Sequence, residues 1–238
     1  MFESSSLLAF ANALETAPAA APGIQPGVQD VLDLAGYEAL VDLIRREGLD
    51  KMPGDLLEIG CFLGGGTAKL AKVAAETGKR VWVIDVFDPA FDVTQNLSGN
   101  RMADLYAKFL RGRGQEEVFR EVTAPWSESI RVIKEDSMKV QLPDDLRLAF
   151  AFTDGNHNAA WVKSDFKLVW KHLVPGGWAG FHDYGGDLPE VTAALNSMMT
   201  EHDGEIRRVE RIKKRWILLV QKRAGAETPR NPRKEESK

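Results

Sequence analysis

The sequence predicts an α/β fold, a doubly wound and mostly parallel sheet of seven strands that ends in an antiparallel hairpin. Three observations predict it. From residue 55 onward, short apolar runs alternate with amphipathic helical segments, as in parallel sheets that are covered on both faces. A glycine-rich loop separates the first run from the first of these helices. Two β-type runs near the end, at 205–210 and 216–221, are close enough in sequence to pair as a hairpin.

The chain before the sheet is expected to hold two helices. Apolar residues recur at helical spacing in residues 4–14, and the proline- and glycine-rich stretch at 17–27 then ends this helix. We therefore expect residues 1–28 to form a helical arm. A second helix is expected over 29–46, where apolar residues again recur at helical spacing.

The main domain is expected over residues 29–222. An insertion at 86–129 interrupts the alternation of strands and helices, and one stretch of it has a helical apolar face. Such a segment is suited to covering a substrate or contacting a second copy of the chain. The charged, proline-containing residues 223–238 are expected to form a disordered tail. The expected strands are 56–59, 81–84, 130–134, 148–152, 178–181, 205–210 and 216–221, and the expected helices of the sheet are 67–76 and 160–172.

Composition and charge exclude several classes of protein. The 238 residues, 44% hydrophobic and 28% charged, are enough for one medium-sized soluble domain. Residues 207–238 contain 12 basic and 4 acidic side chains, so the rest of the chain, with 19 basic against 31 acidic, has a formal charge of −12. An acidic body with a basic end does not resemble a dedicated nucleic-acid binder. No apolar run approaches the roughly 20 residues of a membrane span.

Cysteine content and the N-terminus indicate the compartment. The single cysteine, Cys61, cannot form an internal disulfide. No Lys or Arg precedes Arg45, although secretory and transit signals need positive charge. We therefore expect a soluble, cytoplasmic protein.

The glycine-rich loop at 60–66 is the first functional feature. Glycines let the backbone turn sharply and let a ligand approach closely, and the next helix begins with free N–H donors. Phe62 breaks the spacing of a dinucleotide fingerprint, and no Gly-Lys-Ser/Thr follows as in a P-loop. About 20 residues on, Asp85 ends the second strand, where a carboxylate can accept hydrogen bonds from ribose. Asp136 and Ser137 follow the third strand. Each feature alone could be a turn or a solvated acid, but together they favour a nucleoside cofactor.

These features resemble class I S-adenosylmethionine-dependent methyltransferases, which have a Rossmann-like fold, over roughly residues 55–222. The Asp-Gly-Asn-His turn at 154–157 and the His-Asp-Tyr strand end at 182–184 are similar to the small-molecule and sugar O-methyltransferases, the macrocin O-methyltransferase group of methyltransferase family 24. The resemblance implies S-adenosylmethionine as cofactor and a homodimer. The cofactor-binding residues that it implies are Glu58, Gly60, Leu63, Gly64, Gly65, Thr67, Asp85, Asp136, Ser137 and Asp154.

Four acidic and histidine side chains follow the fourth and fifth strands. If these strands are neighbours, their ends lie about 5 Å apart, so Asp154, His157, His182 and Asp183 converge beside the cofactor. Carboxylates with imidazole can hold a divalent cation, and we expect Mg²⁺ on Asp154, His182 and Asp183, where it would lower the pKa of a substrate hydroxyl. His157 is expected to be the catalytic base, together with Asp154, because its ordinary pKa is near neutral.

Blander roles stay open for these four residues. Asp154 could bind the amino group of the cofactor, His157 could cap the next helix, and His182 could pack under Tyr184. A mechanism without metal is also open.

The expected function is O-methylation of a hydroxyl on a small molecule, such as a sugar or a glycosylated natural product, with no nucleic acid or membrane as partner. One alternative is a non-haem iron oxygenase, since two histidines and a carboxylate can bind iron, although it would not need the cofactor loop. Another is a non-catalytic S-adenosylmethionine-binding module. The basic run at 207–215 is expected to be a solvated turn, or else to attract an anionic substrate such as a phosphorylated or nucleotide-linked sugar.

Overall fold

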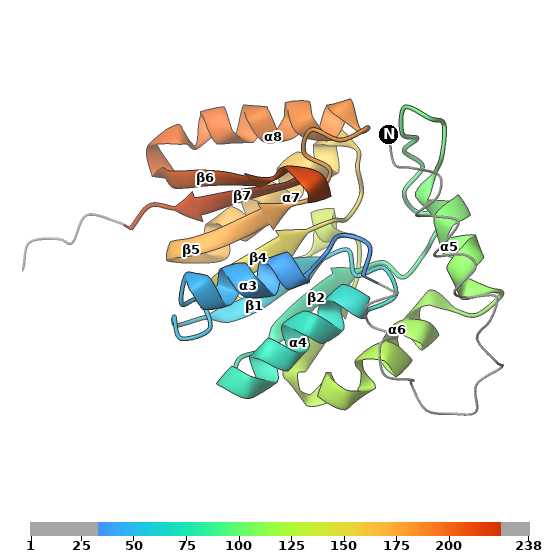
Figure 1. Cartoon of the computed structure of the whole chain (residues 1–238), viewed down its shortest axis with the longest axis horizontal. Helices are drawn as coiled ribbons and strands as arrows, with labels where there is room; N and C mark the ends of the chain where they lie inside the picture. The colour runs from blue at the N-terminus through green and yellow to red at the C-terminus, as the bar shows by residue number, and fades with distance from the viewer. Residues whose placement is uncertain (1–32, 225–238) are drawn as a thin grey trace, which may run out of the picture.

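A seven-stranded sheet with helices on both faces forms the centre of the molecule, in a computed structural model that describes residues 33–224 (Figure 1). The strand order is β3-β2-β1-β4-β5-β7-β6. The first five strands run parallel, and β7 is antiparallel to both β5 and β6, which confirms the predicted fold class. The strands are β1 (Asp55–Ile59), β2 (Val81–Asp85), β3 (Ile130–Lys134), β4 (Leu148–Thr153), β5 (Leu173–Phe181), β6 (Ile206–Ile212) and β7 (Ile217–Lys222).

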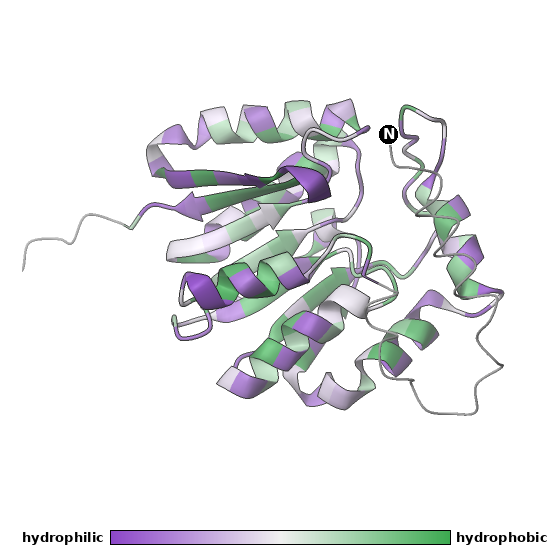
Figure 2. Cartoon of the chain, viewed as in Figure 1, coloured by the Kyte–Doolittle hydropathy of each residue, from purple (hydrophilic) through white to green (hydrophobic). Residues whose placement is uncertain are grey.

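Two hydrophobic cores lie on opposite faces of this sheet. Consecutive strand residues point to opposite faces, so Leu56 packs into one core and Leu57 into the other. This explains why the central strands are hydrophobic along their length (Figure 2). The first core includes α3 (Glu38–Arg46) and α4 (Gly65–Thr77), and the second includes α7 (Ala159–His172) and α8 (Pro189–Glu201).

The insertion between β2 and β3 contains two α-helices rather than the single one expected. They are α5 (Met102–Leu110) and α6 (Gln115–Thr123), and a 3₁₀ segment (Ala124–Ser129) follows them. Another difference is that β5 begins at Leu173 rather than at 178, because Leu173 already pairs with Leu148 of β4.

The helix expected at 29–46 begins only at Glu38 within the described residues. Gly36 has a φ of +85°, which a helix does not accommodate. The carboxylate of Asp33 accepts hydrogen bonds from the backbone N–H groups of Gly36 and Tyr37, both at 2.7 Å, and so stabilises a turn in place of a helix. The arm expected at 1–28, the first residues of this helix, and the tail after residue 224 lie outside the described residues.

The carboxyl ends of the parallel strands meet at one edge of the sheet. There Asp154 donates its backbone N–H to the carbonyl of Ile59 at 2.8 Å, and His182 donates to Thr153 at 3.0 Å. Residues that follow β4 and β5 are therefore neighbours, as the sequence predicts. None of the described helices has the length and apolar character that a membrane crossing requires.

Candidate functional site

The glycine-rich loop is built on close backbone contacts. Gly60 has a φ of +80°, and a Cβ atom there would lie 2.1 Å from the carbonyl oxygen of Asp154. A Cβ atom at Gly66 would lie 2.4 Å from the ring of Tyr37. At these two positions neighbouring protein atoms require glycine, so the loop packs tightly against the turn after β4 at Gly60 and against Tyr37 at Gly66.

Glu58 lies at the end of β1 and is fully buried. Its carboxylate accepts hydrogen bonds from the Tyr37 hydroxyl at 2.7 Å and from the Thr67 hydroxyl. Burial raises the pKa of Glu58 to about 8, and the nearby charges of Asp85 and Asp154 also raise it. Glu58 therefore ties β1 to α4 and to the turn before α3. The sequence marks Tyr37 only as one apolar position of a helix.

Asp85 is buried at the end of β2 and is held by its surroundings. Its carboxylate accepts backbone N–H groups of Cys61 at 2.9 Å and of Phe87 at 2.7 Å, and it accepts the side-chain amide of Gln115 at 3.3 Å. Burial raises the pKa of Asp85, although these hydrogen bonds lower it. Gln115, which begins α6, was not predicted, because nothing in the local pattern places the insertion beside β2.

The segment after β3 is fixed by two residues of α7. Asp136 accepts hydrogen bonds from the backbone of Met138 at 3.1 Å and from the indole of Trp161 at 2.9 Å. Asp165 is buried, and one of its carboxylate oxygens has no hydrogen-bond partner among the described residues. Burial raises the pKa of Asp165 to about 7, although a hydrogen bond with Ser137 lowers it.

A crevice runs along the carboxyl ends of β2, β1 and β4. Four of the ten predicted cofactor residues line it, as does the predicted base His157. The lining residues among the predicted ones are Gly60, Asp85, Ser137, Asp154 and His157. Phe91, Tyr106 and Trp161 add aromatic walls.

The other predicted cofactor residues lie behind the crevice or beside it. Leu63 is fully buried in an apolar cluster with side chains of α4, α5 and α6, so only its backbone is available to a ligand. Gly64, Gly65 and Thr67 are buried at the start of α4.

A larger hollow lies at the opposite edge of the sheet, beside Asp55, Lys79 and Trp82. Its polar groups mainly satisfy one another: Trp82 donates to Asp55 at 3.0 Å, and Lys79 donates to the carbonyl of Gly54 at 2.6 Å. The crevice is therefore the stronger candidate site, because it adjoins a cluster of titratable side chains.

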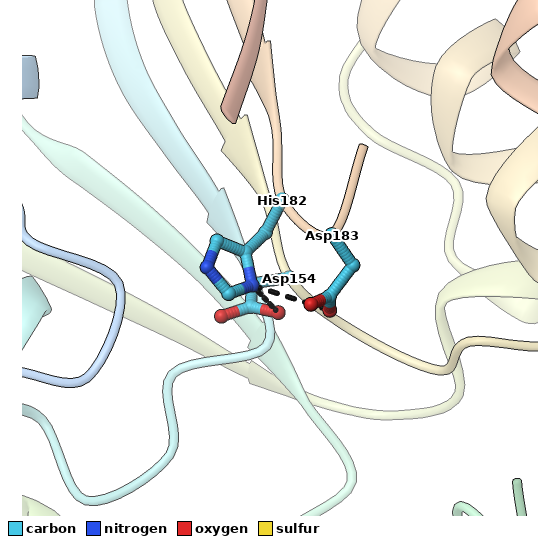
Figure 3. A group of neighbouring side chains, drawn as sticks. All are labelled: Asp154, His182 and Asp183. Atoms are coloured by element: carbon cyan, nitrogen blue, oxygen red, sulfur yellow. Dashed lines mark ion pairs between the residues drawn. The ribbon is translucent and has the colours of Figure 1, made fainter. Parts of the chain in front are cut away.

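Asp154, His182 and Asp183 converge at the ends of β4 and β5 (Figure 3). One potential ligand atom from each lies within 4.8 Å of the others. Nδ1 of His182 lies 3.2 Å from a carboxylate oxygen of Asp154 and 3.2 Å from one of Asp183, yet neither approach has hydrogen-bond geometry. Asp183 has a φ of +59°, a strained conformation for a residue that is not glycine.

This arrangement fits a divalent cation. Three donors aim at one point, and the buried Nδ1 of His182 lacks a well-formed hydrogen bond. Burial alone would lower the pKa of His182, but the charges of Asp154 and Asp183 raise it to about 10. Two carboxylates and one imidazole are a common donor set for such ions.

His157 is buried between carboxylates. Its Nδ1 lies 2.5 Å from Asp92, and its Nε2 lies 2.8 Å from Asp183 and 3.7 Å from Asp154. Burial alone would lower the pKa of His157, but hydrogen bonds with the three carboxylates raise it well above its usual value. The sequence led us to expect His157 as a base because the ordinary pKa of an imidazole is near neutral. In the structure both of its ring nitrogens face carboxylates.

Asp92 was not predicted, since it precedes His157 by 65 positions and lies in a loop without a periodic pattern. The engagement of His157 also bears on the iron-oxygenase alternative. Among residues 33–224 the metal-capable group contains one histidine, His182, and His157 lies beside this group with both ring nitrogens directed at carboxylates.

Comparisons with known proteins agree with this architecture. The family described as "Methyltransferase domain" matches residues 57–184, more than half of the chain. A curated relative, the tRNA N(3)-methylcytidine methyltransferase trm140 of Schizosaccharomyces pombe, is 26% identical over 167 residues, which are 70% of this chain and 47% of that protein. The chain thus spans about half the length of this relative.

Two solved structures are similar over nearly the whole chain. The O-methyltransferase NovP has a TM-score of 0.62 at 17% identity and covers 90% of this chain and 95% of its own. CalS11, a TDP-rhamnose 3'-O-methyltransferase of calicheamicin biosynthesis, has a TM-score of 0.59 at 15% identity and covers 91% and 93%. Because the sequence identities are only 15% and 17%, the similarity to these two structures establishes the fold alone.

Proposed function

The chain belongs to the methyltransferase domain family, and from this membership we propose that it is an S-adenosylmethionine-dependent O-methyltransferase of small hydroxylated molecules, such as sugars or glycosylated natural products. One observation carries the proposal: the crevice beside the glycine loop leads directly to Asp154, where three potential metal ligands converge. The fold shared with NovP and CalS11, both named as O-methyltransferases, supports transfer to oxygen.

We place the cofactor in the crevice. Asp85 would accept the ribose hydroxyls, and Asp136 with Ser137 would border the adenine. The backbone of the loop at Gly60, Gly64 and Gly65 would border the methionine part, and the surrounding carboxylates would offset the sulfonium charge. Three of the predicted residues would not contact the cofactor with their side chains, which are fully buried and stabilise the conformation of the loop: Glu58, Leu63 and Thr67.

Asp154, His182 and Asp183 would hold a divalent cation. When bound, such an ion lowers the pKa of an acceptor hydroxyl next to it. Mg²⁺ is the first candidate, and Mn²⁺ is the second because it accepts an imidazole ligand more readily.

In this proposal Asp154 takes the proton of the acceptor hydroxyl on the carboxylate oxygen that does not bind the cation. Its side chain is 26% exposed and lines the crevice, whereas that of His157 is 9% exposed. His157 instead positions the carboxylates of Asp154 and Asp183 through its Nε2. The rest of the catalysis is alignment of the hydroxyl oxygen with the methyl group.

Calorimetry with S-adenosylhomocysteine tests cofactor binding. We expect saturable binding by the parent chain and a loss of at least about tenfold in Asp85→Ala, since several hydrogen bonds depend on this carboxylate. Asp42→Ala is the matched control, because Asp42 is exposed on α3. If the parent bound neither S-adenosylmethionine nor its demethylated product, the proposed function would be wrong.

Transfer of a labelled methyl group to a panel of hydroxylated acceptors tests the reaction. Asp154→Asn and Asp183→Asn are expected to abolish turnover while S-adenosylhomocysteine still binds. Excess EDTA should stop turnover, and Mg²⁺ or Mn²⁺ should restore it; full activity in EDTA would remove the cation from the proposal. Cofactor binding without any methylated acceptor would favour the non-catalytic module.

We also propose that the insertion contributes to a homodimer. Val93 and Leu97 on its loop are 78% and 76% exposed, which is unusual for large apolar side chains. Light scattering of the parent and of a Val93→Ser, Leu97→Ser variant would test this, and a monomeric parent would exclude it.

A further inference from the structure

The turn between β6 and β7 lies at the same edge of the sheet as the metal-capable cluster. Because β7 runs antiparallel to β5 and Leu218 pairs with Phe181, the turn lies just past the end of β5. The backbone N–H of Tyr184 donates to the carbonyl of Trp216 at 2.8 Å, which ties the turn to the segment after Asp183. Figure 1 shows the hairpin turn on the side of the molecule that also carries α5.

The end of β6 and the turn after it concentrate positive charge, and we call the four cations there the basic tip. All are exposed, and none forms an ion pair with another residue of the described chain. Arg208, by contrast, is paired with Glu47 at 2.6 Å and with Glu210 at 2.9 Å. The basic tip consists of Arg211, Lys213, Lys214 and Arg215.

Arg211 is held in place beside the site. Its guanidinium lies 4.7 Å from the ring centroid of Tyr184. The Tyr184 hydroxyl donates to Asn196 at 2.7 Å, and the N–H of Gly185 donates to the Thr192 hydroxyl at 2.8 Å, so this platform is anchored to α8. Stacking uses the face of the guanidinium and leaves its N–H edge available for an anion.

The crevice and the basic tip have opposite charge. The crevice is lined by acids, including Asp85, Asp92 and Asp154, which suits a sulfonium and a metal ion but repels an anionic group. A ligand that spans both regions would carry its hydroxyl at the crevice and a negative group at the tip. The cations of the basic tip lie within residues 211–215, next to an acidic crevice, whereas a dedicated nucleic-acid binder would lack such acids beside its basic surface.

We propose that the acceptor carries a phosphate or diphosphate group that the basic tip binds. This inference rests on the proposed function and specifies its substrate class. Phosphorylated sugars and nucleotide-linked sugars share this group. Arginine and lysine both bind phosphate, arginine by paired N–H groups and lysine as a point charge.

Binding of defined probes to the full chain loaded with S-adenosylhomocysteine tests the proposal. The probes are inorganic pyrophosphate, a hexose 1-phosphate and a nucleoside diphosphate hexose, with a methyl hexoside as the uncharged control. We expect the phosphorylated probes to bind and the methyl hexoside to bind at least tenfold more weakly. Competition between the hexose 1-phosphate and the nucleoside diphosphate hexose then identifies which of the two binds more tightly.

The variant Arg211→Gln, Lys213→Gln, Lys214→Gln should weaken the binding of the phosphorylated probes at least tenfold. The Kd of S-adenosylhomocysteine should stay within twofold of the parent value.

The control Lys51→Gln, Lys72→Gln, Arg80→Gln makes the same charge change at exposed positions outside the basic tip and should leave probe binding within twofold. Thermal melting of both variants checks that they remain folded.

Two results would overturn the inference while the proposed function stands. In the first, S-adenosylhomocysteine binds but no phosphorylated probe does, or the probes bind the tip variant as tightly as the parent. In the second, a tRNA binds through the tip and the sugar phosphates fail to compete. Absence of S-adenosylhomocysteine binding would instead remove the proposed function itself.

Discussion

The contact between Asp92 and His157 is expected to determine the rate of methyl transfer. Asp92 comes from the inserted segment, and its Oδ2 accepts from both the ring Nδ1 and the backbone N–H of His157, at 2.5 and 3.3 Å. Its Oδ1 accepts the backbone N–H of Thr94 at 2.9 Å. Asp92→Asn keeps the size of the side chain and the bond to Thr94 but replaces the carboxylate beside a buried imidazole with a neutral amide.

The size of the effect follows from the loss of a hydrogen bond between buried charged groups, about 1.5–3 kcal/mol. At about 1.4 kcal/mol for each factor of ten, kcat should fall about 10- to 150-fold. The Kd of S-adenosylhomocysteine should stay within about twofold, because Asp92 acts through His157. Asp92 is thus a positioning residue in this prediction.

Methyl-transfer kinetics with any acceptor found in the panel provide the assay. Asp92→Glu should recover part of kcat, and Asp88→Asn serves as the control from the same loop, since the Asp88 carboxylate accepts the backbone N–H of Ala90 at 3.0 Å and does not contact His157. Proton NMR should show a strongly downfield Nδ1–H of His157 that disappears in Asp92→Asn. If Asp92→Asn turned over like Asp88→Asn and the downfield signal persisted, the reasoning would be refuted.

Three further predictions concern the packing around the site. Gly66→Ala places a Cβ atom 2.4 Å from the Tyr37 ring, so its Tm should fall by several degrees, whereas Gly204→Ala, with no neighbour within 4 Å, should melt close to the parent; equal Tm values would contradict the packing argument. Tyr37→Phe removes the donor to Glu58 and should lower the free energy of unfolding in urea by about 1–3 kcal/mol, and an unchanged value would show that the bond is dispensable. Burial raises the pKa of Asp165 to about 7, so the folded state holds a proton that the unfolded chain has released above about pH 4, and stability should fall as the pH rises from 4 through 7; Asp165→Asn should remove a penalty of a few kcal/mol at pH 8, and a stability difference from the parent that is equal at pH 5 and pH 8 would contradict this.

The strands could be predicted because both faces of the sheet are covered, which makes their sequences continuously apolar. This signal is local and strong, and the hairpin at the end is equally local. The predicted start of α3 was wrong, because the spacing of apolar residues cannot show that the Asp33 carboxylate stabilises a turn by hydrogen bonds to Gly36 and Tyr37. Helix boundaries depend on such single hydrogen bonds.

The convergence of Asp154, His182 and Asp183 could also be predicted, because residues that follow neighbouring parallel strands meet at one edge. The residues of the insertion that contact the site could not be predicted in this way. Asp92 and Gln115 come from an insertion whose path over the sheet is set by tertiary packing. The sequence therefore could not show that Asp92 contacts the ring of His157.

The outermost strand also limits how copies of this chain can associate. Within residues 33–224, β6 ends the sheet and pairs with β7 on one side only. Its exposed side chains include Arg207, Arg208 and Arg211, and charges of this kind on an edge strand oppose pairing with a strand from another molecule. Sheet extension at β6 is therefore disfavoured, so subunit contacts on this side of the sheet are expected to form through helices or loops, and the adjoining turn stays accessible to small solutes.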